Sequence, residues 1–97
     1  MRILARNYRC RSGEIDVVAK DGATLVFVEV KERRGESHGS AVEAVTERKR
    51  ARVVRAARIY AASKGLSESP IRFDVVAIDW GPSGPQLRHD VDAFSAG

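Results

Sequence analysis

Two carboxylates and one amine, those of Asp16, Glu29 and Lys31, are the side chains of this sequence whose types and spacing could do chemistry together. Glu29 and Lys31 lie two positions apart at the end of the apolar run 25–31. That run is typical of a β-strand, in which alternate side chains share a face, so the acid and the amine point the same way. Because such a pair is costly at the end of a core strand unless something uses it, we treat it as a candidate site.

A hairpin is expected to bring the remaining acids to this pair. A second strand, residues 14–19, precedes the run and is joined to it by a short turn. Opposite residues of an antiparallel pair share a face. With a loop of about four residues, Asp16 lies opposite Glu29, and Glu14 lies opposite Lys31. A register shifted by two residues sets Glu14 opposite Glu29 instead, and both registers gather the four side chains into one patch.

The side chains of this patch are suited to binding a hard metal ion. Asp16 and Glu29 offer oxygen ligands, which suit Mg²⁺ or Mn²⁺. Zinc usually takes His and Cys ligands, and these are missing around the pair. A bound ion lowers the pKa of an attacking water, while Lys31 could orient or deprotonate that water and offset charge growing on a phosphate. Metal, water and lysine together would suffice for phosphodiester hydrolysis.

The elements that must position these residues follow from the hydrophobic pattern. Alternation and turn residues predict strands, and a helical period predicts a helix. In chain order we expect a first strand within 1–10, strands at 14–19 and 25–31, a loop at 33–40, a helix from Thr46 to Gly65, a strand at 71–79 and a tail segment at 87–94. In the second strand, Ile15 and Val17 are expected on one face, with Asp16 and Val18 on the other.

The helix decides the type of sheet. Thr46 can cap its start and Gly65 its end, and its apolar stripe consists of Val53, Val54, Ala57, Tyr60 and Ala61. A crossover helix makes the strands that it connects parallel. The sequence therefore predicts an α/β fold with a mixed sheet, in the order strand-strand-strand-helix-strand. The tail is expected to dock by Leu87, Val91 and Phe94.

Length and composition limit the number of domains, the kind of partner and the cellular location that we expect. The chain has 97 residues, 43% of them hydrophobic, so we expect residues 1–97 to form a single domain with one core. A formal net charge of +4 fits an anionic partner such as nucleic acid or a membrane surface. The single cysteine cannot form an internal disulfide, and neither a signal peptide nor a long apolar run is present. We therefore expect a cytoplasmic protein without a membrane partner.

The motifs around the patch resemble a known family. Residues 13–16 followed by 27–31 are similar to the D…ExK signature of the restriction-endonuclease-like PD-(D/E)xK nucleases. Across nearly the whole chain the sequence resembles the YraN family of bacterial endonuclease-like proteins. The segments that carry this resemblance are 3–7, 13–19, 27–33, 44–46 with Lys49, 72–76, and His89 with 93–94.

The resemblance implies a restriction-endonuclease-like core and a role for each residue of the motif. It implies that Asp16 and Glu29 bind the metal, that the Val30 carbonyl adds a ligand, and that Lys31 serves the hydrolytic water. The family pattern also has a helix carrying a glutamate ahead of the first strand, and this helix is missing before Ile3. A fourth acidic position, one face of the core and the activity are therefore left open.

Plainer alternatives exist for the charged residues of the patch. Glu29 and Lys31 could form a cross-strand salt bridge with Glu14 or Asp16 at a sheet edge. Glu14 could be a metal ligand, an outer carboxylate around the metal, a salt-bridge partner of Arg11, or a solvated residue at the start of its strand. The flanking motif favours the metal site for the first pair and leaves Glu14 undecided.

Basic side chains near the motif are expected to bind phosphates, and they are Arg33, Arg34, Arg48, Lys49 and Arg52. The start of the helix after Thr46 adds N–H groups that favour an anion. The alternative is a solvated helix face with Glu43 and Glu47 as local partners. Lys49 and Arg33 are expected nearest to the motif.

Three functions fit these observations. The first is a nuclease dependent on Mg²⁺ or Mn²⁺ that cuts branched or flapped DNA by structure, with RNA as the alternative substrate and a homodimer expected by analogy with junction resolvases. Sequence-specific readout is not expected, because aromatic residues are only 6% of the chain and are not interleaved with the arginines. The second is a catalytically inactive nucleic-acid-binding module, and the third is a protein-interaction adaptor. Divalent-metal affinity and salt-sensitive DNA binding separate the three.

Overall fold

Within residues 1–34 and 45–96, which the structure describes, this computed structural model has five strands and one helix. In chain order they are β1 (Arg2–Cys10), β2 (Gly13–Asp21), β3 (Thr24–Arg34), α1 (Glu47–Ser63), β4 (Ile71–Gly81) and β5 (Gly84–Phe94). Most of the predicted loop 33–40, including His38, lies outside the described residues.

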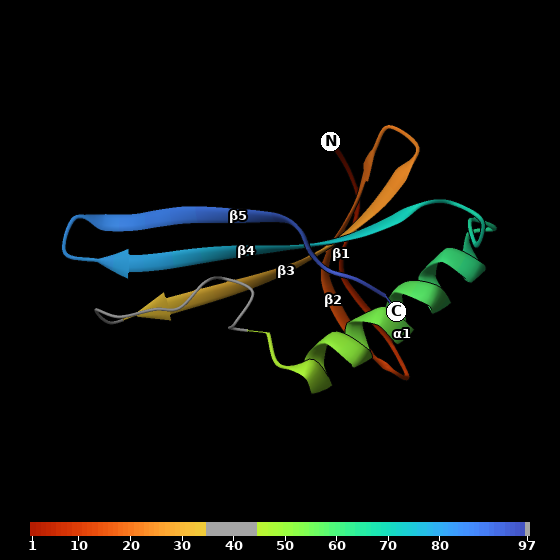
Figure 1. Cartoon of the computed structure of the whole chain (residues 1–97), viewed down its shortest axis with the longest axis horizontal. Coiled ribbons are helices and arrows are strands. Elements are labelled where there is room, and N and C mark those ends of the chain that lie inside the picture. Colours follow the sequence, from red (N-terminus) through yellow and green to blue (C-terminus); the bar gives the residue numbers. More distant parts are fainter. Residues whose placement is uncertain (35–44, 97) are drawn as a thin grey trace.

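The strands form one sheet in the order β1-β2-β3-β4-β5. β3 and β4, which α1 connects along the chain, pair in parallel, whereas the other neighbouring strands are antiparallel. This confirms the predicted mixed α/β sheet and the strand-strand-strand-helix-strand order, and it is consistent with a nuclease-like core. Figure 1 shows α1 beside β1 and β2, while the β4–β5 hairpin extends away from the helix. In the described ranges, no helix is both long enough and apolar enough to span a membrane.

The core that positions the helix is aromatic. Tyr60 of α1 meets Tyr8 and Phe27 edge-on, with ring centroids 5.1 and 6.0 Å apart. Phe27 continues to Phe73 at 5.7 Å. The predicted apolar stripe of the helix is buried, and it consists of Val53, Val54, Ala57, Tyr60 and Ala61. Because burying each large apolar side chain contributes about 1.5–3 kcal/mol, this stripe fixes α1 across the strands that carry the candidate carboxylates.

Both ends of α1 are capped as predicted. The Lys49 N–H donates to the Thr46 hydroxyl oxygen at 3.2 Å. At the other end, Gly65 has a φ of +70°, and the Leu66 N–H donates to the Ala61 carbonyl at 2.7 Å, which is a Schellman arrangement. The N-terminal cap fixes the backbone of Lys49 in the first helical turn.

The β2–β3 hairpin has the predicted register in which the two carboxylates face each other. Its cross-strand pairs begin at Val17 with Val28 and continue in step to Asp21 with Thr24. The loop between the last pair is therefore two residues long, shorter than the predicted four. Gly22 makes this tight turn possible with a φ of +61°.

The alternation predicted for β2 is wrong at its start. Ile15 and Val18 both pack in the core cluster that α1 covers, whereas Val17 packs with Val28 in a separate cluster. The change of face coincides with Asn7 of β1, which lies between two regular β1–β2 pairs and has a φ of +51°. Asparagine tolerates this left-handed region better than most residues. The alternation of β2 thus breaks between Ile15 and Val17, beside this irregular residue of the neighbouring strand.

The tail segment 87–94 is part of a fifth strand rather than a docked tail. β5 pairs antiparallel with β4, and Phe94 stacks on Phe73 with ring centroids 5.0 Å apart, so Phe94 docks as predicted. The predicted docking of Leu87 and Val91 is wrong, because these side chains are 73% and 56% exposed. They lie on the hairpin that extends away from α1 in Figure 1, where the helix does not cover the sheet.

A buried carboxylate joins β4 to β5. Asp74 is fully buried and accepts two hydrogen bonds from Arg72, at 2.9 and 3.0 Å, and one from the Asp92 N–H at 2.9 Å. His89 Nε2 lies 2.8 Å from the second carboxylate oxygen. Burial raises the pKa of Asp74, but the hydrogen bonds from Arg72, Asp92 and His89 outweigh it and hold the pKa below its ordinary value. Arg72 and Asp74, two positions apart in β4, are the sequence signal for this contact.

Replacement of Asp74 tests this junction. We expect Asp74→Asn to lower the free energy of unfolding by about 3 kcal/mol at neutral pH, because buried donors lose a charged acceptor. Asp21→Asn removes only the exposed partner of Arg72 and should cost at most about 1 kcal/mol. Because the folded pKa is depressed, the difference from wild type should shrink as the pH falls below 3.8. Urea unfolding at several pH values measures both effects, and a difference that persists in strong acid would contradict them.

Candidate active site

Beyond the last backbone pair of β2 and β3, side-chain carboxylates accept hydrogen bonds from the main chain of the opposite strand. The Val30 N–H donates to Asp16 Oδ2 at 2.8 Å, and the Asp16 N–H donates to Glu29 Oε2 at 3.3 Å. The last regular pair before them is Val17 with Val28. Each carboxylate thus accepts from a main-chain donor of the opposite strand, and this exchange places the two acids side by side.

Glu29 is the acid that the fold encloses. It is 1% exposed, and its Oε1 has no hydrogen-bond partner among the residues described. Burial raises the pKa of Glu29 above its ordinary value of 4.5, and the charge of Asp16 raises it further, while Lys49 lowers it. Because an unsatisfied buried oxygen is costly, this atom is the place in the pair where a cation gains most.

The cation that reaches this oxygen comes from α1. Lys49 Nζ lies 3.2 Å from Glu29 Oε1, an ion-pair distance without the geometry of a hydrogen bond. The lysine side chain is 40% exposed, so the pair joins a buried acid to a solvent-accessible amine. Sequence reasoning places Lys49 near the motif but misses this contact, because it depends on how the helix packs on the sheet.

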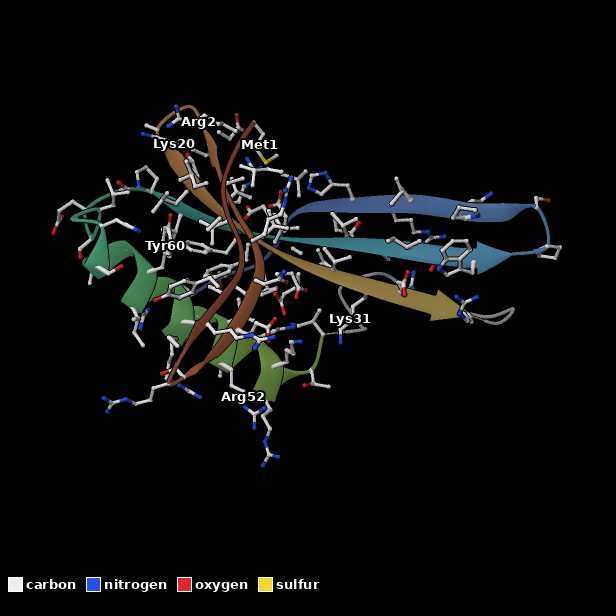
Figure 2. The ribbon with its side chains drawn as sticks, turned by 180° about the vertical axis from the view of Figure 1, so that it is seen from behind. Met1, Arg2, Lys20, Lys31, Arg52 and Tyr60 are labelled. Atoms are coloured by element: carbon white, nitrogen blue, oxygen red, sulfur yellow. The ribbon has the colours of Figure 1, made fainter. Side chains whose placement is uncertain are left out.

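Lys31 follows Glu29 along β3 on the same side of the strand, since alternate residues share a face. Figure 2 shows Lys31 extending from β3 on the side where α1 begins. Its side chain is partly exposed. The predicted set of two acids and one amine therefore lies on neighbouring strands below the first turn of the helix.

The donor set fits a hard divalent ion. Asp16 and Glu29 supply carboxylate oxygens, and one of these, Glu29 Oε1, is buried with the Lys49 ammonium 3.2 Å away. In the parts of the chain that the structure covers, no group of three or more His, Cys, Asp or Glu residues is arranged to hold a metal. Two carboxylates, with waters and substrate oxygens in the other positions, are a usual way to bind Mg²⁺. The pair does not offer the nitrogen and sulfur ligands that zinc prefers.

The sequence is similar to those of one bacterial protein family over most of its length. Residues 1–78 match the model of the Uncharacterised protein family UPF0102. The chain is 55% identical to a UPF0102 protein of Symbiobacterium thermophilum over 83 residues, which are 86% of this chain and 70% of the relative. A UPF0102 protein of Geobacter sulfurreducens is 47% identical over 96% of this chain and 73% of the relative. One of Frankia alni is 53% identical over 95% of this chain and 78% of the relative. The chain belongs to the UPF0102 family. This confirms the family that the motifs predict.

In this UPF0102 protein, the third candidate acid contacts a different strand. Glu14 pairs across the β1–β2 ladder with Arg9, and the Arg9 Nε lies 3.4 Å from its carboxylate. The salt-bridge alternative for Glu14 is therefore present, with Arg9 in place of the predicted Arg11. A role for Glu14 as a metal ligand stays a prediction.

Two of the predicted phosphate-binding arginines contact β4. Arg33 donates to both oxygens of Asp79, at 2.7 and 3.1 Å, and both side chains are largely buried. Arg34 places its guanidinium 5.1 Å from the ring centre of Trp80. Arg33 therefore already has a carboxylate partner, which the sequence could not reveal because Asp79 lies on a strand beyond the helix.

Two other predicted arginines, Arg48 and Arg52, are exposed on α1. A β-carbon added to Gly13 would lie 3.5 Å from the Arg52 β-carbon, so the helix passes close to the start of β2. Figure 2 shows Arg52 at this end of the molecule. Both arginines lie on the same helical segment as Lys49 and are open to an anionic partner.

Replacement of the buried acid of this UPF0102 protein tests the electrostatics of the site. Glu29→Gln keeps an acceptor for the Asp16 N–H and removes the cost of a buried negative charge. Because the folded pKa of Glu29 is raised, that cost grows as the pH rises above 4.5 and levels off above the folded value. We therefore expect Glu29→Gln to be more stable than wild type at pH 7.5 and to lose this advantage near pH 4.5. Urea unfolding without metal measures it, and a variant less stable than wild type at both pH values would contradict it.

Proposed function

We propose that this UPF0102 protein is a metal-dependent nuclease that hydrolyses phosphodiester bonds in DNA. The observation that carries the proposal is the pairing of Asp16 with Glu29, whose buried Oε1 lacks a hydrogen bond. The metal would be Mg²⁺ or Mn²⁺, held by the two carboxylates, with the Val30 carbonyl as a further candidate ligand. When bound, such an ion lowers the pKa of a water and stabilises charge on a phosphate.

The residues of the chain have separate tasks in this proposal. Asp16 and Glu29 are held in place by main-chain N–H groups, so they need no rearrangement to bind an ion. Lys31, on the same side of β3 as Glu29, would orient the attacking water or take its proton. Its ammonium form would also offset negative charge on the phosphate. The aromatic core between the sheet and α1 holds the helix on the strands that carry these residues.

The first turn of α1 is the proposed contact for the DNA backbone. Arg48 and Lys49 follow Glu47 in this turn, and the start of a helix carries a partial positive charge. These two cations oppose the helix dipole, so they do not stabilise the helix itself. Their position above the carboxylate pair supports a role in binding phosphate.

Shape and charge, rather than base sequence, are the proposed basis of specificity, which favours branched or flapped DNA. The aromatic rings of Tyr60, Phe27 and Phe73 are packed in the core, and Arg34 lies over Trp80. These rings are therefore not free to stack on bases. A chain of this size would gain further contact area as a homodimer.

A nucleic-acid-binding module without turnover is the second candidate. It is favoured by one observation, which is that the Lys49 ammonium already partly neutralises Glu29. In that case the ion pair is permanent and no metal enters.

Cleavage assays with matched variants separate these candidates. We expect wild type to cut branched or flapped DNA in Mg²⁺ or Mn²⁺ and to be inactive in EDTA. Glu29→Gln and Lys31→Ala should each reduce the rate by about 10²-fold or more while leaving DNA binding largely intact, because they act on metal and water.

Glu32→Gln is the control for this assay, since Glu32 lies on the same strand and hydrogen-bonds Trp80 of β4 instead. The Glu32→Gln variant should cut DNA at nearly the wild-type rate. DNA binding without any metal-dependent cleavage would favour the binding module, and full activity of Lys31→Ala would remove the lysine from the mechanism.

The backbone contact predicts a salt-dependent affinity. DNA binding should weaken steeply with salt, and Arg48→Ala and Arg52→Ala should each reduce the slope of log K against log salt by about 0.9 on duplex DNA. Arg58→Ala is the control, because Arg58 lies about 15 Å further along the helix than Arg48. Equal losses for all three variants would point to a diffuse charge effect. Binding that ignores salt would favour the protein-interaction adaptor.

A further inference from the structure

The ion pair between Glu29 and Lys49 joins two partners that differ in their freedom to move. Glu29 is 1% exposed, and its other oxygen accepts from the Asp16 N–H, so this carboxylate is fixed. Lys49 has its backbone fixed by the Thr46 cap, but its side chain is 40% exposed. Water can therefore solvate the ammonium if it turns away, whereas it cannot reach the carboxylate.

The lysine cannot leave by itself. A buried carboxylate without a counter-charge is strongly disfavoured, so loss of the ammonium requires another cation at the same oxygen. A divalent ion on Glu29 Oε1 and an ammonium 3.2 Å from that atom would repel each other in a poorly hydrated site. Arrival of a divalent ion at this oxygen therefore favours departure of the ammonium.

We propose that the Lys49 ammonium takes the place of the divalent ion at Glu29 Oε1 when no metal is bound, and that the arriving ion displaces it. This inference rests on the proposed metal site and deepens it. Lys49 is then a positioning residue, which keeps the carboxylate pair in its binding geometry without metal. Metal binding would release its ammonium beside the exposed Arg48, where a phosphate would arrive.

Amine labelling of the whole protein measures this exchange directly. An N-hydroxysuccinimide ester acylates free lysines, and mass spectrometry reports the rate at each one. We expect Mn²⁺ to speed acylation of Lys49 several-fold, while Lys20 and Lys64, which lie at other ends of the fold, keep their rates. Glu29→Gln should show fast Lys49 labelling without metal and no response to metal. Unchanged or slower labelling of wild-type Lys49 in Mn²⁺ overturns the exchange.

Metal affinity gives a second readout that does not depend on activity. Lys49→Met removes the competing cation, so it should bind Mn²⁺ several-fold more tightly than wild type, as counted from free Mn²⁺ by electron paramagnetic resonance. If Lys49 only supports the structure, Lys49→Met should bind Mn²⁺ more weakly than wild type, because loss of the lysine would disorder the carboxylates. Wild type that binds no Mn²⁺ overturns both the proposed metal site and the exchange. Wild type that binds Mn²⁺ while Lys49→Met binds it more weakly overturns the exchange alone.

Discussion

The exchange of hydrogen bonds between Asp16 and Glu29 is the constraint on which the site depends. Beyond Val17 and Val28, the strands are joined by side chains, with the Val30 N–H on one carboxylate and the Asp16 N–H on the other. The negative charges of these two acids repel each other, and the main-chain donors together with the Lys49 ammonium offset that repulsion. The geometry is therefore built into the backbone, and a bound ion is not needed to create it.

The helix supplies what the strands lack. Packing of its apolar stripe brings the first turn over the carboxylates, and with it Lys49, whose charge faces the buried Oε1 of Glu29. The same packing sets Arg52 close to Gly13 at the start of β2. The helix thus adds the positive charges of Lys49 and Arg52 to the two acids of the strands, and the aromatic core holds the helix on the sheet.

Much of this arrangement could be predicted from local patterns, and the remainder depends on long-range contacts. The β2–β3 register follows from the rule that opposite residues share a face, and the Thr46 and Gly65 caps follow from residue types. The alternation of β2 breaks between Ile15 and Val17, beside the left-handed Asn7 of β1, and no periodic pattern reveals this. The partners Arg33 with Asp79 and Glu29 with Lys49 lie on elements far apart in the chain, so only the packed fold shows them.

Anomalous diffraction from a crystal soaked in Mn²⁺ would show whether Asp16 and Glu29 together hold a divalent ion. We expect one strong peak between the two side chains, at about 2.0–2.5 Å from an oxygen of each. The Lys49 ammonium should then have left Glu29 Oε1. A crystal with no peak at this position, under Mn²⁺ concentrations that support cleavage, would contradict a metal site at this pair.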